Sequence, residues 1–251
     1  MNALLETRNL TKSFGGIRAT NDLSLAVAPG ELHAIIGPNG AGKTTLITQL
    51  IGTARPDTGT ILYKGRDITN LPAHRRARLG LTRSFQITSL IMEMSVLDNV
   101  ALAVQARQGS SFRFIKPVRS DVTLTDRAMA VLAEVGLAEK ANTPVQALSH
   151  GEHRHIEIAI ALASEADCML LDEPMAGLGA EESAAMVRLL SGLKGKHTVV
   201  LIEHDMDAVF ALADRISVLV YGAIIATGTP QEIRGNAEVE AAYLGEESGA
   251  A

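Results

Sequence analysis

Residues 37–44 have the sequence GPNGAGKT, follow the apolar run ELHAII and lead into the helix-like segment TTLITQLI. They match the pattern G-x-x-x-x-G-K-[ST] in the strand–loop–helix setting that this pattern requires. The glycines allow backbone N–H groups to turn inward around phosphate oxygens, toward which the following helix directs its positive end. The stretch therefore predicts a phosphate-binding loop in an α/β fold; the alternative is a glycine-rich turn without a ligand.

The side chains of this loop indicate which part of a nucleotide it holds. Lys43 would reach the β- and γ-phosphates of a nucleoside triphosphate, and the hydroxyl of Thr44 would ligate Mg²⁺. We therefore predict that a nucleoside triphosphate and Mg²⁺ bind here, through the consecutive residues Gly37, Pro38, Asn39, Gly40, Ala41, Gly42, Lys43, Thr44 and Thr45.

Two acids end another apolar run, CMLLDEP, at residues 168–174. In open α/β sheets, ligands lie at the carboxyl ends of the strands. Asp172 would hold Mg²⁺ through water, because Mg²⁺ retains waters when it binds a nucleotide. Glu173 would be the general base that polarises the water attacking the γ-phosphate. The alternative is a pair of solvated acids at a strand end.

Residues 148–154, LSHGEHR, precede the helical run IEIAIALA. Ser149 is a suitable N-cap, and Gly151 would let the backbone approach a ligand closely. The motif is weak by itself, but its position before the strand of Asp172 indicates a second helix N-terminus that faces phosphate. Because one phosphate loop cannot occupy both helix starts, a second nucleotide or a second subunit is implied.

The rest of the pattern favours an α/β fold. Residues 1–36 contain short strands separated by Gly-Gly and Pro-Gly turns. Apolar strands then alternate with helical stretches, and the runs GTILYK, CMLLD, TVVLIE and RISVLV indicate a parallel sheet covered on both faces. Between Gln86 and Pro144, apolar residues recur at three- and four-residue spacing, which indicates a helical insert.

Composition limits the partners and the compartment. Lys and Arg number 23 against 28 Asp and Glu, so the net charge is −5 and nucleic acid is disfavoured as a partner. No apolar run approaches the roughly 20 residues of a membrane helix, and the start lacks a signal-peptide pattern. The single cysteine, Cys168, excludes an internal disulfide framework, and we expect it to be a small buried hydrophobe.

These motifs occur in the order found in the ATP-binding subunits of ABC transporters, which the chain resembles over nearly its whole length. In that family the phosphate loop is followed by a loop glutamine, an LSGGQ-type signature, a strand ending in Asp-Glu and a switch histidine. The matching positions are Gln86 in RSFQ, Ser149 and Gly151 in LSHGE, Asp172 with Glu173, and His204 in LIEHD. Phosphate-loop kinases share only the first motif and a loose version of the fourth.

The resemblance implies a fold as well as a function. The expected fold is an α/β P-loop NTPase of ABC ATPase type, with a mainly parallel core sheet, an antiparallel β subdomain and a helical subdomain. Residues 1–251 would form a single ATP-binding domain. Its core and β parts would span about 1–85 and 151–251, and its helical part about 86–150.

The resemblance also implies roles for single residues. Phe14 in KSFGG matches the aromatic that stacks on adenine, with a strand-packing Phe as the alternative. His204 would hydrogen-bond the γ-phosphate, and Gln86 would sense Mg²⁺ or water and move with the transport subunit; the alternatives are a structural histidine and a surface glutamine. In a head-to-tail dimer, Ser149 and Gly151 of one subunit would contact the γ-phosphate held by the other.

Three positions depart from the family pattern. His150 replaces the usual second signature glycine, and Glu152 replaces the usual glutamine. Gly179 lies where the family commonly carries an acidic or amide residue that communicates across the dimer. These departures bear on the closure of the dimer and on communication between its two sites.

Softer signals favour one branch of the family. The segments FGGIRA, LGLTRSFQ, MSVLDNVALA and AAYLGEE resemble subunits that serve uptake of branched-chain and other hydrophobic amino acids. That branch implies two membrane permease subunits, a second ATP-binding subunit that is identical or related, and an extracytoplasmic solute-binding protein. It also implies a peripheral position on the cytoplasmic face of the membrane.

Other functions remain as alternatives. A soluble ABC ATPase acting on nucleic acid or ribosomes would normally show tandem nucleotide domains or a long heptad coiled coil, and the sequence shows neither. A small-molecule kinase with a phosphate loop would leave LSHGEHR and His204 without a role. Retention of Glu173 and His204 weighs against a binding module that does not hydrolyse ATP.

Overall fold

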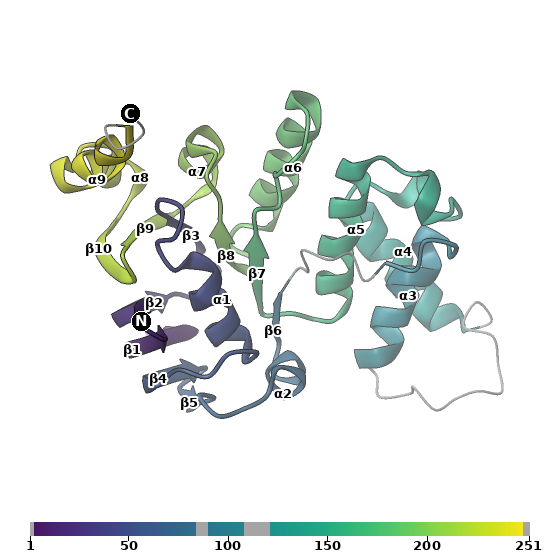
Figure 1. The fold of residues 1–251 in the computed structure, drawn as a ribbon. Coiled ribbons are helices and arrows are strands. Elements are labelled where there is room, and N and C mark those ends of the chain that lie inside the picture. The colour runs from purple at the N-terminus through teal and green to yellow at the C-terminus, as the bar shows by residue number, and fades with distance from the viewer. Residues whose placement is uncertain (1–2, 84–89, 108–120, 248–251) are drawn as a thin grey trace.

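The computed structural model describes residues 3–83, 90–107 and 121–247. Its larger sheet contains β3 (Leu32–Ile36), β6 (Leu81–Arg83), β7 (Cys168–Asp172), β8 (Thr198–Ile202), β9 (Arg215–Val220) and β10 (Ala223–Gly228). The strand order is β10-β9-β3-β8-β7-β6, and all neighbours are parallel except β9 and β10 (Figure 1). Every residue of β3, β7 and β8 is buried, which explains their continuous apolar sequences.

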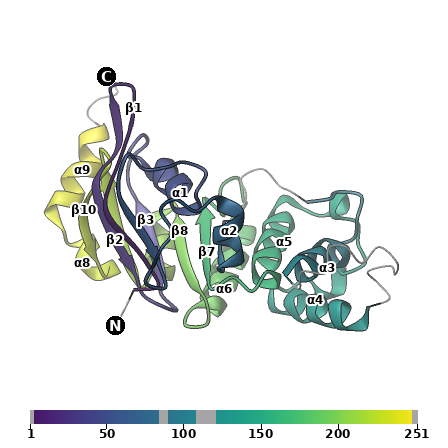
Figure 2. The same cartoon turned by 90° about the horizontal axis from the view of Figure 1, so that it is seen from below.

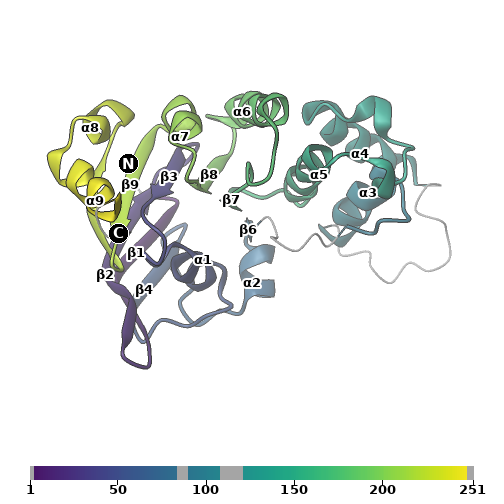
Figure 3. The same ribbon diagram turned by 45° about the horizontal axis from the view of Figure 1, so that its top comes forward.

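A second, antiparallel sheet has the order β2-β1-β4-β5. It consists of β1 (Leu5–Phe14), β2 (Ile17–Val27), β4 (Thr58–Tyr63) and β5 (Arg66–Asp67). Helix α1 (Lys43–Ile51) lies between the two sheets (Figure 3) and buries Leu46, Ile47 and Leu50 in a cluster with residues of both. This packing anchors the start of α1 beside the carboxyl end of β3.

A group of helices lies beyond β6, at the right of Figures 1 and 2. It contains α3 (Val96–Arg107), α4 (Val122–Glu134) and α5 (His150–Ala163), which pack on one another through an apolar cluster that includes Val100, Leu132 and Ile158. Asp121 caps α4 by accepting hydrogen bonds from the N–H groups of Thr123 and Leu124. The short 3-10 turns η2 (Ala138–Lys140) and η3 (Val145–Ala147) connect α4 to α5.

The remaining helices complete the cover of the larger sheet. On the face opposite α1 lie α6 (Ala180–Leu193) and α7 (Met206–Leu212), and α8 (Pro230–Arg234) and α9 (Ala237–Glu247) follow β10 (Figure 3). The short helix α2 (Ala73–Arg78) contacts β6. The predicted mainly parallel core sheet, the antiparallel β part and the helical part are therefore confirmed. No helix within the described ranges is long and apolar enough to cross a membrane.

Two buried features of the core concern polar groups. Cys168 is fully buried, and burial raises the pKa of its thiol to about 12, so it packs as a small apolar residue. On β3, His33 contacts Glu31 Oε1 through Nδ1 at 2.7 Å and Ser217 Oγ on β9 through Nε2 at 2.8 Å. The Ser217 hydroxyl lies 2.8 Å from that of Thr227 on β10. These contacts satisfy polar groups inside the sheet.

Candidate nucleotide-binding and hydrolysis site

The phosphate loop joins β3 to α1, and two of its glycines are required for steric reasons. Gly42, the N-cap of α1, has a φ of +106°, and a Cβ atom there would lie 2.1 Å from the carbonyl oxygen of Ala19. A Cβ atom at Gly37 would lie 2.0 Å from the carbonyl oxygen of Leu219. Strands β2 and β9 therefore press on the loop, and only glycine fits at these two points.

The outer side of the loop is suited to an anion. Asn39, Gly40 and Thr44 are exposed there. Among the described residues, none caps α1 with its side chain, and the first turn of α1 contains no acid. Lys43 donates hydrogen bonds to the carbonyl oxygens of Gly37 and Pro38, the latter at 3.0 Å, so its ammonium group lies at the loop. The positive helix end, the backbone donors and this cation fit a nucleoside triphosphate.

Parallel pairing brings the other predicted groups to the same edge of the sheet. Because β3, β8 and β7 are parallel neighbours, the phosphate loop, His204 and the acids that end β7 all follow the carboxyl ends of adjacent strands. This is the edge at which open α/β sheets bind ligands.

Asp172 is paired with a residue that the sequence did not point to. Arg83 Nη2 donates to Asp172 Oδ2 at 2.6 Å, and the two side chains are 16% and 3% exposed. The register pairs Arg83 with Leu170, so the long Arg side chain reaches the residue two places further along the same face of β7. The sequence LTRSFQ contains this arginine, but it does not reveal the partner of Arg83. That partner depends on how the three-residue strand β6 aligns with β7.

Glu173 and His204 lie beside each other. Glu173 Oε1 is 4.0 Å from His204 Nδ1, and the two side chains are 37% and 66% exposed. Between β8 and His204, Glu203 is buried and accepts hydrogen bonds from the N–H groups of Met175 (2.8 Å) and His204 (3.1 Å). Burial raises the pKa of Glu203 despite these hydrogen bonds. Glu203 ties together the two loops that carry Glu173 and His204, a role that the sequence prediction missed.

The signature segment is a capped helix start, as predicted. Ser149 caps α5 and forms a capping box with Glu152, which is also paired with Lys140. Glu152, which replaces the usual glutamine of the family, therefore stabilises the start of α5. Figures 1 and 2 place α5 among the outer helices, on the far side of β7 from α1. The structure thus does not bring Ser149 to the phosphate loop of its own chain.

Another acid, Glu182 on α6, reaches the donors of this helix start. Its Oε1 accepts from Ser149 Oγ at 3.0 Å and from the N–H of Gly151 at 3.2 Å. Its Oε2 accepts from the N–H of Gly179, the N-cap of α6, at 3.3 Å. These hydrogen bonds lower the pKa of Glu182. Gly179, one of the three departures, thus belongs to a junction between α5 and α6.

Two further residues were predicted from the family resemblance. Phe14 is at the end of β1 and is 54% exposed, and Lys12 Nζ lies over its ring at 5.5 Å from the centroid. Gln86 lies outside the described residues.

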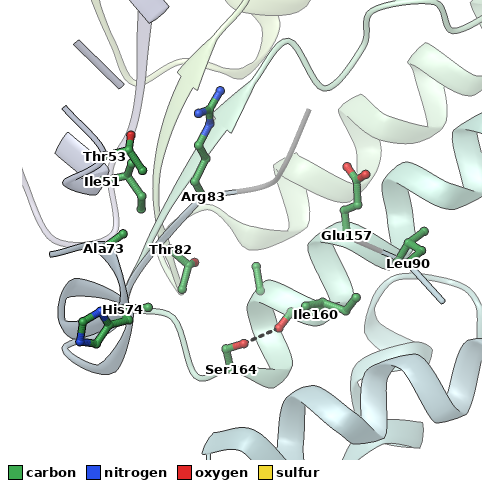
Figure 4. Close-up of a pocket in the computed structure, with 12 residues that line it drawn as sticks. Ile51, Thr53, Ala73, His74, Thr82, Arg83, Leu90, Glu157, Ile160 and Ser164 are labelled. Carbon is green, nitrogen blue, oxygen red and sulfur yellow. Dashed lines mark hydrogen bonds between the residues drawn. The ribbon is translucent and has the colours of Figure 1, made fainter. Parts of the chain in front are cut away.

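A groove of about 380 Å³ opens between the sheet and the outer helices (Figure 4). Its walls are mainly apolar and come from α1, α2, β6 and α5. Within the described ranges, three buried polar atoms near it have no hydrogen-bond partner: Thr82 Oγ1, Arg83 Nε and Glu157 Oε1. The lining residues are Ile51, Thr53, Ala73, His74, Ala77, Thr82, Arg83, Leu90, Glu157, Ile160, Ala161 and Ser164.

With this geometry established, comparison with known proteins defines the class of the chain. Residues 20–176 match the family model described as ABC transporter, and residues 223–248 match the model described as branched-chain amino acid ATP-binding cassette transporter. The chain belongs to the ATP-binding family of ABC transporters and is an ATPase.

Particular relatives narrow the comparison. The chain is 39% identical over 250 residues to the high-affinity branched-chain amino acid transport ATP-binding protein LivG of Escherichia coli strain K12, covering 97% of this chain and 98% of LivG. BraF of Pseudomonas aeruginosa, with the same description, is 40% identical with the same coverage. Among solved structures, the ADP conformation of MJ1267, an ATP-binding cassette of an ABC transporter, superposes with a TM-score of 0.85 at 29% identity, covering 98% of this chain and 100% of that chain.

An export protein is also similar to this chain. The lipopolysaccharide export system ATP-binding protein LptB of Acidithiobacillus ferridurans is 36% identical over 248 residues, covering 98% of this chain and 99% of LptB. Sequence similarity over the whole chain therefore does not distinguish ATP-binding proteins of import systems from those of export systems. Residues 223–248, however, match the family model described as branched-chain amino acid ATP-binding cassette transporter.

Proposed function

We propose that this chain is the ATP-hydrolysing subunit of an importer for branched-chain or other hydrophobic amino acids. Full-length similarity to LivG and BraF supports the proposal, and the observation that carries it is the additional match of residues 223–248 to the branched-chain model. These residues begin in β10 and include α9, on the opposite side of the larger sheet from the outer helices (Figure 1).

In this proposal the phosphate loop holds ATP. Its backbone N–H groups and the start of α1 surround the phosphates, and Lys43 exchanges its carbonyl contacts for phosphate oxygens. Phe14 stacks on the adenine. The donor set of Thr44, Asp172 and Gln86 suits Mg²⁺, which prefers oxygen ligands and, when bound, neutralises phosphate charge.

Hydrolysis would be performed by groups at the strand ends. Glu173 accepts a hydrogen bond from a water and orients the water toward the γ-phosphate. As the general base, it takes the proton of this water during the attack. His204, 4.0 Å from Glu173, donates a hydrogen bond to the γ-phosphate. Glu203 stabilises both loops, because its carboxylate accepts from the backbone on either side.

The proposal also requires other chains. A second ATP-binding subunit, identical or related, presents its Ser149 and Gly151 equivalents to the nucleotide. The two membrane permease subunits dock on the outer helices and on the groove of Figure 4, which offers an apolar surface between the two parts of the chain. The chain then works at the cytoplasmic face of the membrane, and an extracytoplasmic binding protein delivers the solute.

Solute uptake distinguishes the proposal from its alternatives. Permease subunits that co-purify with this chain from native membranes are reconstituted with it in vesicles, together with the matching binding protein. We expect ATP-dependent accumulation of labelled leucine, isoleucine or valine, and loss of accumulation with Lys43→Ala. Co-purification with lipid-export proteins, or ATPase stimulation by RNA or DNA in place of permeases, would overturn the importer assignment.

A further inference from the structure

Arg83 lies between the two regions of the molecule that the proposed function uses. Its Nη2 atom contacts Asp172 at the nucleotide edge of the sheet, at 2.6 Å. The same side chain lines the groove between the sheet and the outer helices. The ion pair between Arg83 and Asp172 is largely buried, because the Asp172 side chain is 3% exposed and the Arg83 side chain is 16% exposed.

The guanidinium group of Arg83 is incompletely satisfied in its present position. Its Nε atom is buried and has no hydrogen-bond partner in the part of the chain that the structure describes. Figure 4 shows Glu157 on α5 across the groove from Arg83; its Oε2 accepts from Arg154 Nη1 at 3.1 Å, whereas its Oε1 is buried without a partner among the described residues. A buried donor and a buried acceptor that both lack partners destabilise the conformation that contains them. Turning Arg83 into the groove would bring this donor toward this acceptor.

The contact with Asp172 has an electrostatic consequence. In the proposed function this carboxylate serves Mg²⁺, yet here it is already neutralised by a cation in a largely buried pair. A divalent cation at the same carboxylate repels the guanidinium, and repulsion is strong where water is excluded. The two cations therefore favour different positions of Arg83.

We propose that Arg83 competes with Mg²⁺ for Asp172, and that the displaced guanidinium turns into the groove and pairs with Glu157. This inference rests on the proposed role of Asp172 in holding the metal. It makes Arg83 a positioning residue that connects the metal side of the nucleotide site to the proposed permease-docking groove. Binding of two ligands to one protein is coupled reciprocally. If a permease segment binds the groove more tightly when Arg83 is turned toward Glu157, its binding also increases the affinity of the site for Mg²⁺.

The test is the contribution of the metal to ADP binding by the full chain. ADP affinity is measured by calorimetry in EDTA and in saturating Mg²⁺, and the ratio of the two affinities is the readout. Arg83→Gln removes the competing cation, so the ratio should rise about tenfold. Arg78→Gln, which removes an exposed arginine of the neighbouring helix α2, is the matched control and should leave the ratio unchanged. An unchanged or lower ratio in Arg83→Gln overturns the competition.

Two further variants separate the steps. Glu157→Gln removes the second acceptor, so it should lower the ratio in the otherwise wild-type chain and leave it unchanged in the Arg83→Gln background. Equal effects in both backgrounds overturn the movement toward Glu157. Asp172→Asn should bring the ratio close to one; if it does not, the proposed metal role of Asp172 fails, rather than the competition alone.

Each variant is checked for folding by circular dichroism, because Arg83 and Glu157 are buried. If Arg83→Gln does not fold, Arg83→Lys keeps a cation but lacks the planar fork of the guanidinium, and is therefore a weaker competitor. In that variant we expect the ratio to rise about threefold. An unchanged or lower ratio there overturns the competition in the same way.

Discussion

Glu173 adopts a backbone conformation that is uncommon for a residue with a side chain. Its φ is +49°, and its N–H donates to the carbonyl oxygen of Ile202 at 2.9 Å. Such conformations persist when the surrounding structure holds them, and they are frequent at sites of chemistry. The turn leaves the carboxylate partly exposed beside His204, with its position set by the two neighbouring strands.

Glu173→Gln tests the proposed base, because it preserves the shape of the side chain and removes its charge. We expect ATP affinity to stay within about twofold of the wild type and hydrolysis to slow by roughly 10²–10⁴-fold. Titration with fluorescent ATP and phosphate release in Mg²⁺ measure the two effects. Glu181→Gln, at an exposed acid of α6, is the control and should change neither. Near-normal turnover of Glu173→Gln would refute the assignment.

Lys43→Ala tests the phosphate loop. A charge-assisted hydrogen bond to phosphate is lost, so ATP affinity should fall about tenfold to hundredfold. The same fluorescence titration measures it, with thermal unfolding as the check on structure. Wild-type affinity in the variant would mean that the nucleotide binds elsewhere.

Gly42→Ala and Gly40→Ala form a matched pair within this loop. Both residues have positive φ, so alanine at either costs about 1 kcal/mol of folding stability through backbone strain. At Gly42 the new Cβ atom would also meet the carbonyl oxygen of Ala19, at 2.1 Å, whereas at Gly40 no atom of the described residues lies within 4 Å of it. Overpacking adds about 1–3 kcal/mol, so Gly42→Ala should be the less stable variant in urea unfolding. Equal stabilities would contradict the close packing of β2 on the loop.

At the scale of elements, α5 and α6 are joined at their first turns. The carboxylate of Glu182 on α6 accepts hydrogen bonds from Ser149 and Gly151 of α5 while also capping its own helix. In the proposed function, a phosphate from the partner site would use the Ser149 and Gly151 donors. Closure of a dimer therefore requires Glu182 to move, which couples α6 to the signature segment.

The junction predicts a pH dependence. These hydrogen bonds lower the pKa of Glu182 from 4.5 in the folded chain, so they stabilise the fold above pH 4.5 and the stabilisation is lost as pH falls through the lowered pKa. Glu182→Gln should therefore unfold at a lower temperature than the wild type at pH 7, and the difference should shrink below pH 4.5. Differential scanning fluorimetry across this range measures it, with Glu181→Gln as control. A difference that is constant with pH would show that the charge of Glu182 is not involved.

At the scale of the whole molecule, the proposed site is complete only with a second subunit. Glu173→Gln should retain ATP and associate into dimers, because ligand that binds across the interface favours the assembled state. Light scattering with Mg²⁺ and ATP measures the mass, for the chain alone and with its co-purifying ATPase. Ser149→Ala in the Glu173→Gln background removes one proposed phosphate contact and should weaken association. Absence of association in both mixtures would count against the shared site.

The residues of the site differ in how far sequence predicts them. The phosphate loop, Asp172, Glu173 and His204 follow from motifs at strand ends, because parallel pairing brings such ends to one edge. Arg83 depends on the register of the short strand β6, and Glu182 on the approach of two helix starts far apart in sequence. Glu203 directly follows the apolar run of β8, but its burial depends on both loops that it holds. Tertiary contacts of this kind leave little local signal.

The polar row from the buried Glu31, His33 and Ser217 to the exposed Thr227 also favours one alignment of the strands. A slip of β9 by one residue exchanges its two faces, both of which are buried, and places Ile216 or Val218 where His33 needs the hydroxyl of Ser217. A slip by two residues keeps every side chain on its face, but it places Arg215 or Leu219 where His33 needs the hydroxyl of Ser217. The polar row therefore penalises misalignments of β9 that its apolar sequence alone would tolerate, and it favours one register for the β9–β10 hairpin that leads into the C-terminal helices.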